Sequence, residues 1–219
     1  MVDHETGSYW MQVSGEALVG ELAGQRLTAL PSQTTTWKLW REQFPASAVL
    51  SQDTGFERNY TYDPFSGLGE QYNQGADFIF PVSETGNDPR LDPGEVVLGA
   101  EHTDGKQYAW PIERIGDGVI NDQLGENRNT PVAIFSTAEG PTAVAYAAEV
   151  NGQTLTFVFE DGIYVDEQTG SEWSFSGKAT SGSLEGTQLV ALPSRSTFWF
   201  SLITSFPDLV FWDPNAGDQ

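Results

Sequence analysis

The pattern of hydrophobic and polar residues predicts a strand and a glycine-marked hairpin near the start of the chain. Apolar residues take alternate positions from Tyr9 to Val13, which is the spacing of one face of a strand. Glycines punctuate residues 15–31, and a proline closes that stretch. We therefore expect a strand at the first position and a hairpin at the second, with 26–30 as the second strand of the hairpin.

The sequence predicts two helices, the first of them from aromatic residues at helical spacing. Trp37, Trp40 and Phe44 lie on one helical face, after a threonine run that can cap the first turn and before a proline that ends the helix. Apolar residues 198–206 have the same setting, and Ser194–Thr197 is the expected cap. The short strands expected after these helices are Val49–Leu50 and Val210–Phe211.

Residues 95–164 are the strand-rich part of the sequence. A hairpin is expected at its start, because the pair Asp104-Gly105 is favoured in tight turns. Residues 113–125 are expected to form a short helical or irregular link. Three or four strands then follow, and the turns expected between them are Glu139-Gly140, Asn151-Gly152 and Asp161-Gly162.

The segment 51–94 is rich in Gly, Asp, Asn, Tyr and Pro and predicts a long, mostly irregular loop. One strand is expected in it, Phe78–Val82. Its aromatic residues could line a sugar-binding groove, because rings stack on sugars while amides and carboxylates bond the hydroxyls. The alternative is that the same rings pin the loop in place. The candidate ligand-binding residues are Tyr60, Tyr62 and Tyr72.

The same loop carries several carboxylates that could hold a calcium ion, which takes oxygen ligands. The spacing of an Asp-x-Asp-x-Asp-Gly calcium loop is absent. The alternative is that these carboxylates form a solvated acidic surface. No cofactor other than calcium is expected. The candidate metal ligands are Asp63, Asp77, Asp88 and Asp92.

A stretch from Val2 to about Leu50 recurs from Val165 to about Trp212, and we name the two the first and second repeat segments. Each contains a Thr-Gly-Ser-x-Trp element, a glycine-marked hairpin, a Leu-Pro pair and an apolar run ended by Phe-Pro. A period of this length is that of a whole domain, not of a solenoid. The repeated positions are Asp3, Thr6, Gly7, Ser8, Trp10, Asp166, Thr169, Gly170, Ser171 and Trp173.

These repeated residues have two interpretations. The serine could be a nucleophile, but neither copy shows a Gly-x-Ser-x-Gly elbow. In a turn, the aspartate accepts backbone hydrogen bonds, the glycine takes a positive φ and the tryptophan anchors the next strand. We favour the turn and expect no catalytic residue in either copy.

Together the patterns predict a mainly β (β-rich α+β) fold. It is a duplicated module of strands and hairpins with one short helix per repeat, and its first copy is incomplete because no strand-rich half precedes it. The expected divisions are residues 1–94 (the C-terminal half of the first copy and the long loop), 95–214 (the second, near-complete copy) and 215–219 (a tail).

The chain is strongly acidic, with 31 Asp and Glu against 10 Lys and Arg and a formal net charge of -21. This excludes nonspecific nucleic-acid binding, which needs a cationic surface. An acidic surface keeps a protein soluble at high salt, so we expect a salt-adapted source. The competing explanation is a calcium-binding secreted protein.

The sequence has no cysteine, which excludes disulfides, thiolate metal sites and a cysteine nucleophile. No apolar run approaches the roughly 20 residues that cross a bilayer. Residues 1–10 lack the pattern of a signal peptide. His4 and His102 are interpreted as exposed polar residues of a turn and a hairpin, with an acid–base or metal role as the alternative.

Several motifs together resemble the prokaryotic family called domain of unknown function 3179. They are the first hairpin with Tyr108 and Pro111, the run Ile120-Asn121-Asp122, both Thr-Gly-Ser-x-Trp elements and both Leu-Pro…Thr-x-Trp runs. The resemblance covers nearly the whole chain and implies a haloarchaeal-type member that is truncated at its N-terminus.

The resemblance also implies a setting outside the cytoplasm, because family members commonly begin with a signal or lipoprotein leader. The family's cysteine-containing motif would fall at residues 134–138, where this chain has no cysteine. A histidine that often follows the first hairpin is absent from residues 112–119.

We therefore expect a non-catalytic, extracytoplasmic binding or structural module whose partner is a small molecule or a protein. The alternative is an enzyme or metal-binding protein whose active copy lies upstream of Met1 or in the loop 51–94.

Overall fold

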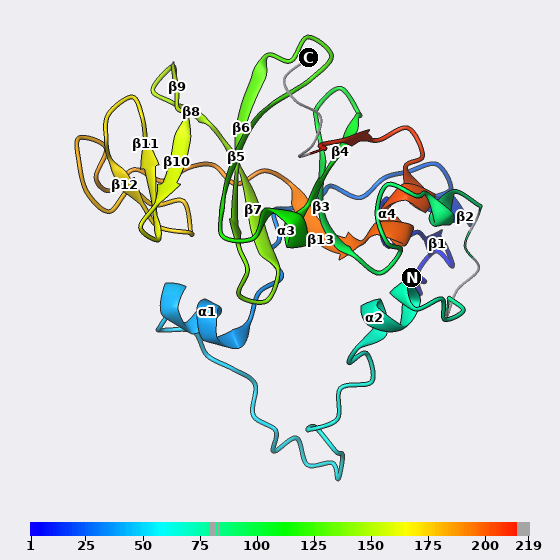
Figure 1. The fold of residues 1–219 in the computed structure, drawn as a ribbon. Coiled ribbons are helices and arrows are strands. Elements are labelled where there is room, and N and C mark those ends of the chain that lie inside the picture. The colour runs from blue at the N-terminus through cyan, green and yellow to red at the C-terminus, as the bar shows by residue number, and fades with distance from the viewer. Residues whose placement is uncertain (79–81, 83, 214–219) are drawn as a thin grey trace.

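Strands dominate the computed structural model, which describes residues 1–78, 82 and 84–213 (Figure 1). The helical elements are α1 (Trp37–Gln43), α2 (Leu68–Asn73), the short 3₁₀ helix η1 (Glu84–Asn87), α3 (Ile112–Ile115) and α4 (Trp199–Ser205). The strands are β1 (Tyr9–Trp10), β2 (Ala17–Val19), β3 (Val96–Glu101), β4 (Gln107–Pro111), β5 (Gly118–Leu124), β6 (Thr130–Thr137), β7 (Thr142–Ala147), β8 (Glu149–Val150), β9 (Gln153–Thr154), β10 (Phe157–Glu160), β11 (Ile163–Asp166), β12 (Glu172–Trp173), β13 (Ser194–Phe198) and β14 (Val210–Phe211). The mainly β class predicted from the sequence is confirmed, with the strands divided among several small sheets.

A four-stranded sheet in the order β13-β3-β4-β14 lies at the centre of the molecule. Helix α4 packs on one face of it through buried Trp199 and Leu202. A Cβ added to Gly99 of β3 would stand only 3.0 Å from Leu202 Cδ1, which is tighter than ordinary contact. The glycine therefore lets the helix approach the sheet closely.

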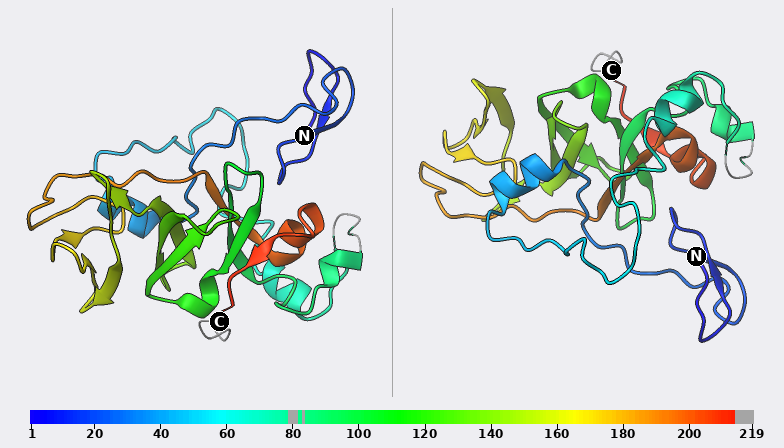
Figure 2. Two further views of the ribbon diagram at one scale, coloured as in Figure 1. Left: turned by 90° about the horizontal axis from the view of Figure 1, so that it is seen from above. Right: turned by 90° about the horizontal axis from the view of Figure 1, so that it is seen from below.

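The other face of this sheet packs on a second sheet, ordered β5-β6-β7. Leu98 and Trp110 from the first sheet and Ile134 from the second belong to one buried cluster. The far side of the second sheet contacts β10, β11 and β12 through an aromatic cluster that includes Phe135 and Trp173. The layers therefore follow one another from α4 to the β10–β12 sheet, which lies at the opposite end of the molecule from β1 and β2 (Figure 2).

Strand β5 was not predicted, since the sequence indicated a helical or irregular link over 113–125. Only α3 and the turn after it fit that prediction. In β5, Asn121 exchanges two hydrogen bonds with the backbone of Phe157, both 2.8 Å. Asp122 Oδ2 accepts a hydrogen bond of 3.0 Å from the Trp110 indole. These polar side chains are satisfied by distant partners, so the local pattern does not reveal a strand.

Helix α1 begins where the sequence predicted it. Its cap is Thr36, whose hydroxyl accepts a hydrogen bond of 3.2 Å from the Leu39 backbone. No residue of α1 is buried. Lys38 forms an ion pair of 2.9 Å with Glu139 in the turn between β6 and β7. Figure 1 shows α1 apart from α4 and joined to α2 by a long irregular loop.

The predicted cap of the second helix is wrong. Residues 194–197 lie in β13, and the N-cap of α4 is Phe198, which makes no side-chain capping bond. The reason is that β3 offers an edge along which all five residues of β13 find antiparallel partners. The tertiary pairing therefore outweighs a local capping signal.

Four short strand predictions have different outcomes. Val210–Phe211 is confirmed as β14, parallel to β4. Val49–Leu50 is wrong, because these residues pair with no strand and are 65% and 95% exposed. Over 26–30 only Arg26 forms an isolated bridge, with Glu16. The expected strand at 9–13 is reduced to β1.

The loop 51–94 contains α2 and η1, which the sequence analysis missed. A Cβ at Gly94 would stand 2.0 Å from the backbone oxygen of Gly69. These two glycines therefore allow a close contact between two backbone segments, and do not simply mark an irregular loop. The predicted strand Phe78–Val82 falls mostly on residues 79–81, outside the described residues. In the described part of the chain, no helix is both long and apolar enough for a membrane crossing.

Candidate functional site

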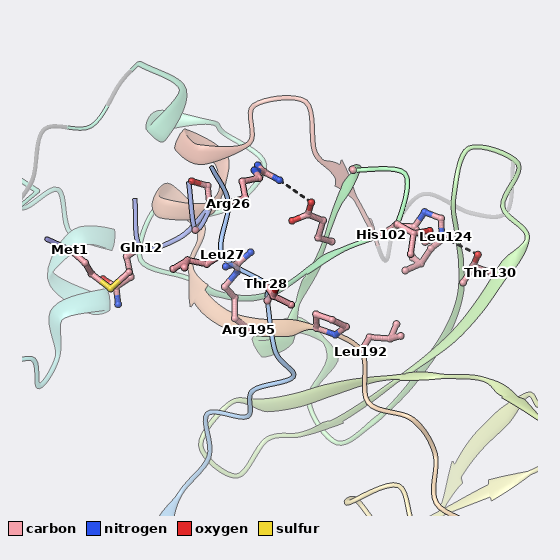
Figure 3. A pocket seen from close by; sticks show the side chains of 17 residues that line it. Met1, Gln12, Arg26, Leu27, Thr28, His102, Leu124, Thr130, Leu192 and Arg195 are labelled. Carbon is pink, nitrogen blue, oxygen red and sulfur yellow. Dashed lines mark hydrogen bonds and ion pairs between the residues drawn. The ribbon is translucent and has the colours of Figure 1, made fainter. Parts of the chain in front are cut away.

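A cleft of about 640 Å³ lies between the first repeat segment and the ends of β3, β6 and β13; we name it the polar cleft because the charged side chains of Arg26, Glu101 and Arg195 line it, although most of its wall is apolar. Residues 12–15 and 26–29 form one wall. Figure 3 shows Leu27 and Thr28 close to Arg195, with His102 and Thr130 farther along the cleft. Segments far apart in the sequence therefore build this site together.

Arg195 is the most distinctive group in the polar cleft. It pairs with Gly99 across β13 and β3, so its side chain lies on the face that carries α4, opposite a residue without a side chain. Its guanidinium is half-buried and makes no hydrogen bond or ion pair to any residue that the structure describes. Burial lowers the pKa of Arg195, Glu101 opposes this shift and Arg26 adds to it. The group stays protonated, because arginine does not lose its proton in proteins.

Arg26 is the second cation of the polar cleft and already has partners. Its Nη1 lies 2.9 Å from Glu101 Oε1 and its Nε lies 4.0 Å from Glu16 Oε2. The backbone bridge between Arg26 and Glu16 fixes this position. Glu101 therefore neutralises Arg26 and leaves Arg195 as the cation free to meet a ligand.

His102 lies in the wall of the same cleft and is not the exposed hairpin residue that the sequence suggested. Only 14% of its side chain is exposed. Its Nδ1 stands 3.0 Å from Asp104 Oδ1 and its Nε2 stands 3.1 Å from Thr130 Oγ1. The nearby Gly125 N–H donates to the Tyr108 hydroxyl at 2.8 Å and is therefore already engaged rather than free to donate to a ligand oxygen in the cleft. The contacts of His102 hold the ring in the wall of the cleft.

An apolar cleft of about 510 Å³ lies beside the polar one, between the first repeat segment and the helices α2 and α4. Tyr72 lines it and is 3% exposed. The Tyr72 ring makes T-shaped contacts with the rings of Phe198 and Phe200, and its centroid lies 6.0 Å from the first and 5.1 Å from the second. Of the three tyrosines proposed as ligand contacts, Tyr72 alone lines either of these two clefts.

Tyr60 and Tyr62 lie in the exposed part of the loop. They are 43% and 69% exposed, and the Tyr60 hydroxyl is 2.6 Å from Thr54 Oγ1. The structure therefore does not bring the three tyrosines together. No charged side chain among the described residues lines the apolar cleft that Tyr72 enters.

The proposed metal-binding carboxylates do not converge either. The residues described by the structure contain no group of three or more His, Cys, Asp or Glu side chains able to hold a metal ion. Asp88 makes a two-pronged ion pair with Arg90, at 2.9 and 3.0 Å. Asp63 accepts a hydrogen bond of 2.9 Å from the Phe65 backbone. Asp77 and Asp92 are exposed.

The Thr-Gly-Ser-x-Trp elements are turns whose side chains bond to one another. Buried Asp166 accepts hydrogen bonds of 2.7 and 2.8 Å from Thr169 and of 3.0 Å from the Trp173 indole. In the first copy, Asp3 likewise accepts from the backbone and the hydroxyl of Thr6. Ser8 and Ser171 each accept a backbone hydrogen bond, and the only other partner of either hydroxyl among the described residues is the threonine of the same turn.

Sequence reasoning missed Arg26, Glu101 and Arg195. For the two arginines, the scarcity of basic residues was the available signal: a chain with 10 Lys and Arg holds two of them in one cleft. Nothing local in the sequence shows that residues 26 and 195 meet, because β13 and the first repeat segment are brought together only by the fold.

Comparison with known proteins bears on the whole chain. No curated protein and no solved structure matches it. The family described as "Protein of unknown function (DUF3179)" matches residues 1–209. Since that match covers nearly all of the 219 residues and agrees with the motifs, the chain belongs to the DUF3179 family.

Proposed function

We propose that this protein is a non-catalytic binding module that holds a small ligand by an anionic group in the polar cleft. The observation that carries the proposal is the half-buried Arg195 guanidinium, which has no hydrogen-bond partner among the described residues. A half-buried guanidinium is only partly hydrated, and a carboxylate would supply two charge-assisted hydrogen bonds to its fork of donors. The ligand would thus supply the hydrogen-bond partner that the Arg195 guanidinium lacks among the described residues.

The other polar groups of the cleft support binding rather than chemistry. Arg26 is neutralised by Glu101, and Thr130 is held by His102. Both pairs are polar side chains at fixed positions, which is how binding sites set the orientation of a ligand. A ligand with a hydroxyl or amide beside its carboxylate would find partners there.

We also propose that the two repeat segments are copies of one unit. Leu22 and Leu184 each donate a backbone hydrogen bond of 3.1 Å to the hydroxyl of Ser8 or Ser171. A Cβ on the glycine two residues before either leucine would stand 2.6 or 2.7 Å from the Cα of that serine. Such closely matched contacts, at positions that also match in sequence, favour duplication over coincidence.

The setting we propose is outside the cytoplasm of a salt-adapted prokaryote, as a haloarchaeal-type member of the family. The net charge of -21 supports salt adaptation. The resemblance to a family whose members carry export or lipoprotein leaders supports the location.

The first experiment tests the role of Arg195 with butanoate as the probe. Amide chemical shifts of the full chain are followed by NMR as butanoate is added. We expect saturable shifts around the polar cleft, and Arg195→Gln should weaken binding about tenfold, the size of a lost charge-assisted hydrogen bond.

The matched control is Lys178→Gln, which removes one positive charge from an exposed residue outside the cleft. It should leave the affinity unchanged. Equal affinities of wild type and Arg195→Gln, or no saturable binding to the wild type, would contradict the proposed function.

A further inference from the structure

The polar and apolar clefts adjoin each other. Met1 and Gln12 line both of them, which places a shared wall between the two. Strand β13 also runs along both: Arg195 lines the polar cleft and Thr197, two residues further on, lines the apolar one. Residues two apart in a strand project from the same face, about 7 Å apart. One ligand of modest length can therefore reach from one cleft into the other.

The apolar cleft offers a surface suited to an alkyl chain. Phe65, Leu68 and Phe200 line it, together with the ring of Tyr72. Phe65 is 67% exposed, so an aromatic ring at the mouth of this cleft is left in contact with water. The volume of the apolar cleft, about 510 Å³, falls within the range of about 300–1,000 Å³ that is usual for small-molecule sites.

The charges favour an anionic head at one end only. The polar cleft holds Arg195 and the Arg26–Glu101 pair, whereas the described walls of the apolar cleft carry no charged side chain. An acid with a polar head and an apolar tail matches both halves, and a short polar acid matches only one. A cationic ligand would be repelled by the positive charge of Arg195.

We propose that the paired clefts bind an amphiphilic carboxylate, with its head on Arg195 and its unbranched alkyl tail along Phe65, Leu68 and Phe200. This rests on the proposed function, because the same arginine receives the anionic group. It adds the chemical class of the ligand: a single-chain fatty acid or an acid of similar shape.

The test compares decanoate with butanoate on the full chain by isothermal titration calorimetry, below the concentration at which decanoate forms micelles. Each buried methylene should tighten binding roughly fourfold, so decanoate should bind at least about a hundredfold more tightly than butanoate. Decanol, which has the tail without the charge, should bind with equal affinity to wild type and to Arg195→Gln. Decanoate should bind about tenfold more weakly to Arg195→Gln.

Variants of the apolar cleft separate the tail from the head. Ser201→Phe places a ring in this cleft and should abolish the preference for decanoate, while Ser183→Phe, the same change at an exposed serine outside both clefts, should keep it. Phe65→Ser removes a mostly exposed ring and should reduce the preference even if Ser201→Phe does not fold.

The outcomes distinguish the two proposals. Equal affinities for decanoate and butanoate, both lost in Arg195→Gln, would overturn the amphiphile inference and leave the proposed function standing. Saturable binding of neither acid would overturn both. A preference for decanoate that survives both Ser201→Phe and Phe65→Ser would show that the tail lies elsewhere and would also overturn the inference.

Discussion

At the scale of single residues, Asp88 shows how the role of a carboxylate depends on its neighbours. Asp88, a candidate metal ligand by composition, is held by Arg90. The Arg90 guanidinium in turn lies over the ring of Trp199, 5.0 Å from its centre. The hydrogen bond from Arg90 lowers the pKa of Asp88, with burial opposing it. The pair therefore ties the segment after η1 to the helix α4.

Asp88→Asn should destabilise the protein at neutral pH by about 0.5–1 kcal/mol, the range for a partly exposed ion pair. The folded-state pKa of Asp88 lies below its unfolded value, so this stability is present above the unfolded pKa and is lost as pH falls through the folded one. Urea unfolding at pH 7 and near pH 3 measures how this stability changes with pH. The difference between wild type and variant should shrink at the lower pH, and a constant difference would contradict the role of the ion pair.

At the scale of elements, α1 and α4 show that one sequence pattern can give two environments. Both helices begin with tryptophan and end before Phe-Pro. Trp199 of α4 is fully buried against the central sheet, whereas Trp37 of α1 is 50% exposed. The spacing of aromatic residues makes each helix, but only α4 has a sheet to cover its apolar face.

The two tryptophans form a matched pair for mutation. Trp199→Ala should cost about 3–5 kcal/mol in free energy of unfolding, because it leaves a cavity between α4 and the sheet. Trp37→Ala should cost less than about 1 kcal/mol, as expected for a half-exposed side chain. Urea unfolding of both variants measures the difference. Equal losses would mean that α1 is packed against a partner as closely as α4 is.

At the scale of the whole molecule, the net charge of -21 sets the response to salt. The acidic residues are spread along the chain, so their repulsion acts on the compact state as a whole. Salt screens that repulsion more than it would screen a short contact between Arg195 and the carboxylate ligand that we propose.

Raising KCl from about 0.05 M to about 1 M, where the Debye length is about 3 Å, should increase the free energy of unfolding. Thermal unfolding across the KCl series measures this. A control variant, Glu149→Gln with Glu160→Gln and Glu185→Gln, removes three exposed negative charges and should respond less steeply. A stability independent of KCl in both proteins would argue against a salt-adapted surface.

Much of the fold could be predicted because its signals are local. The Asp104-Gly105 turn, the Thr36 cap and the helical spacing of Trp37 and Trp40 each act within a few residues. Strand β5 could not be predicted in this way, since Asn121 bonds a backbone 36 positions away.

The candidate site was the least predictable part. The tyrosines chosen from composition are dispersed, and only Tyr72 lines a cleft of the two described. The groups that do meet, Arg26, Glu101 and Arg195, stand in segments without a shared motif. A motif carries information about neighbours in sequence, whereas a cleft is defined by neighbours in space.

The sequence by itself determined the mainly β class, the family, the turns of the repeated elements and the two aromatic helices. These follow from short-range backbone preferences and from motifs that are read directly along the chain. Only the tertiary structure decided that residues 194–197 form a strand, that one helix is buried and the other is not, and that Arg195 opens into a cleft. The physical reason is that strand pairing, burial and the solvation of a charge depend on which distant segments come into contact.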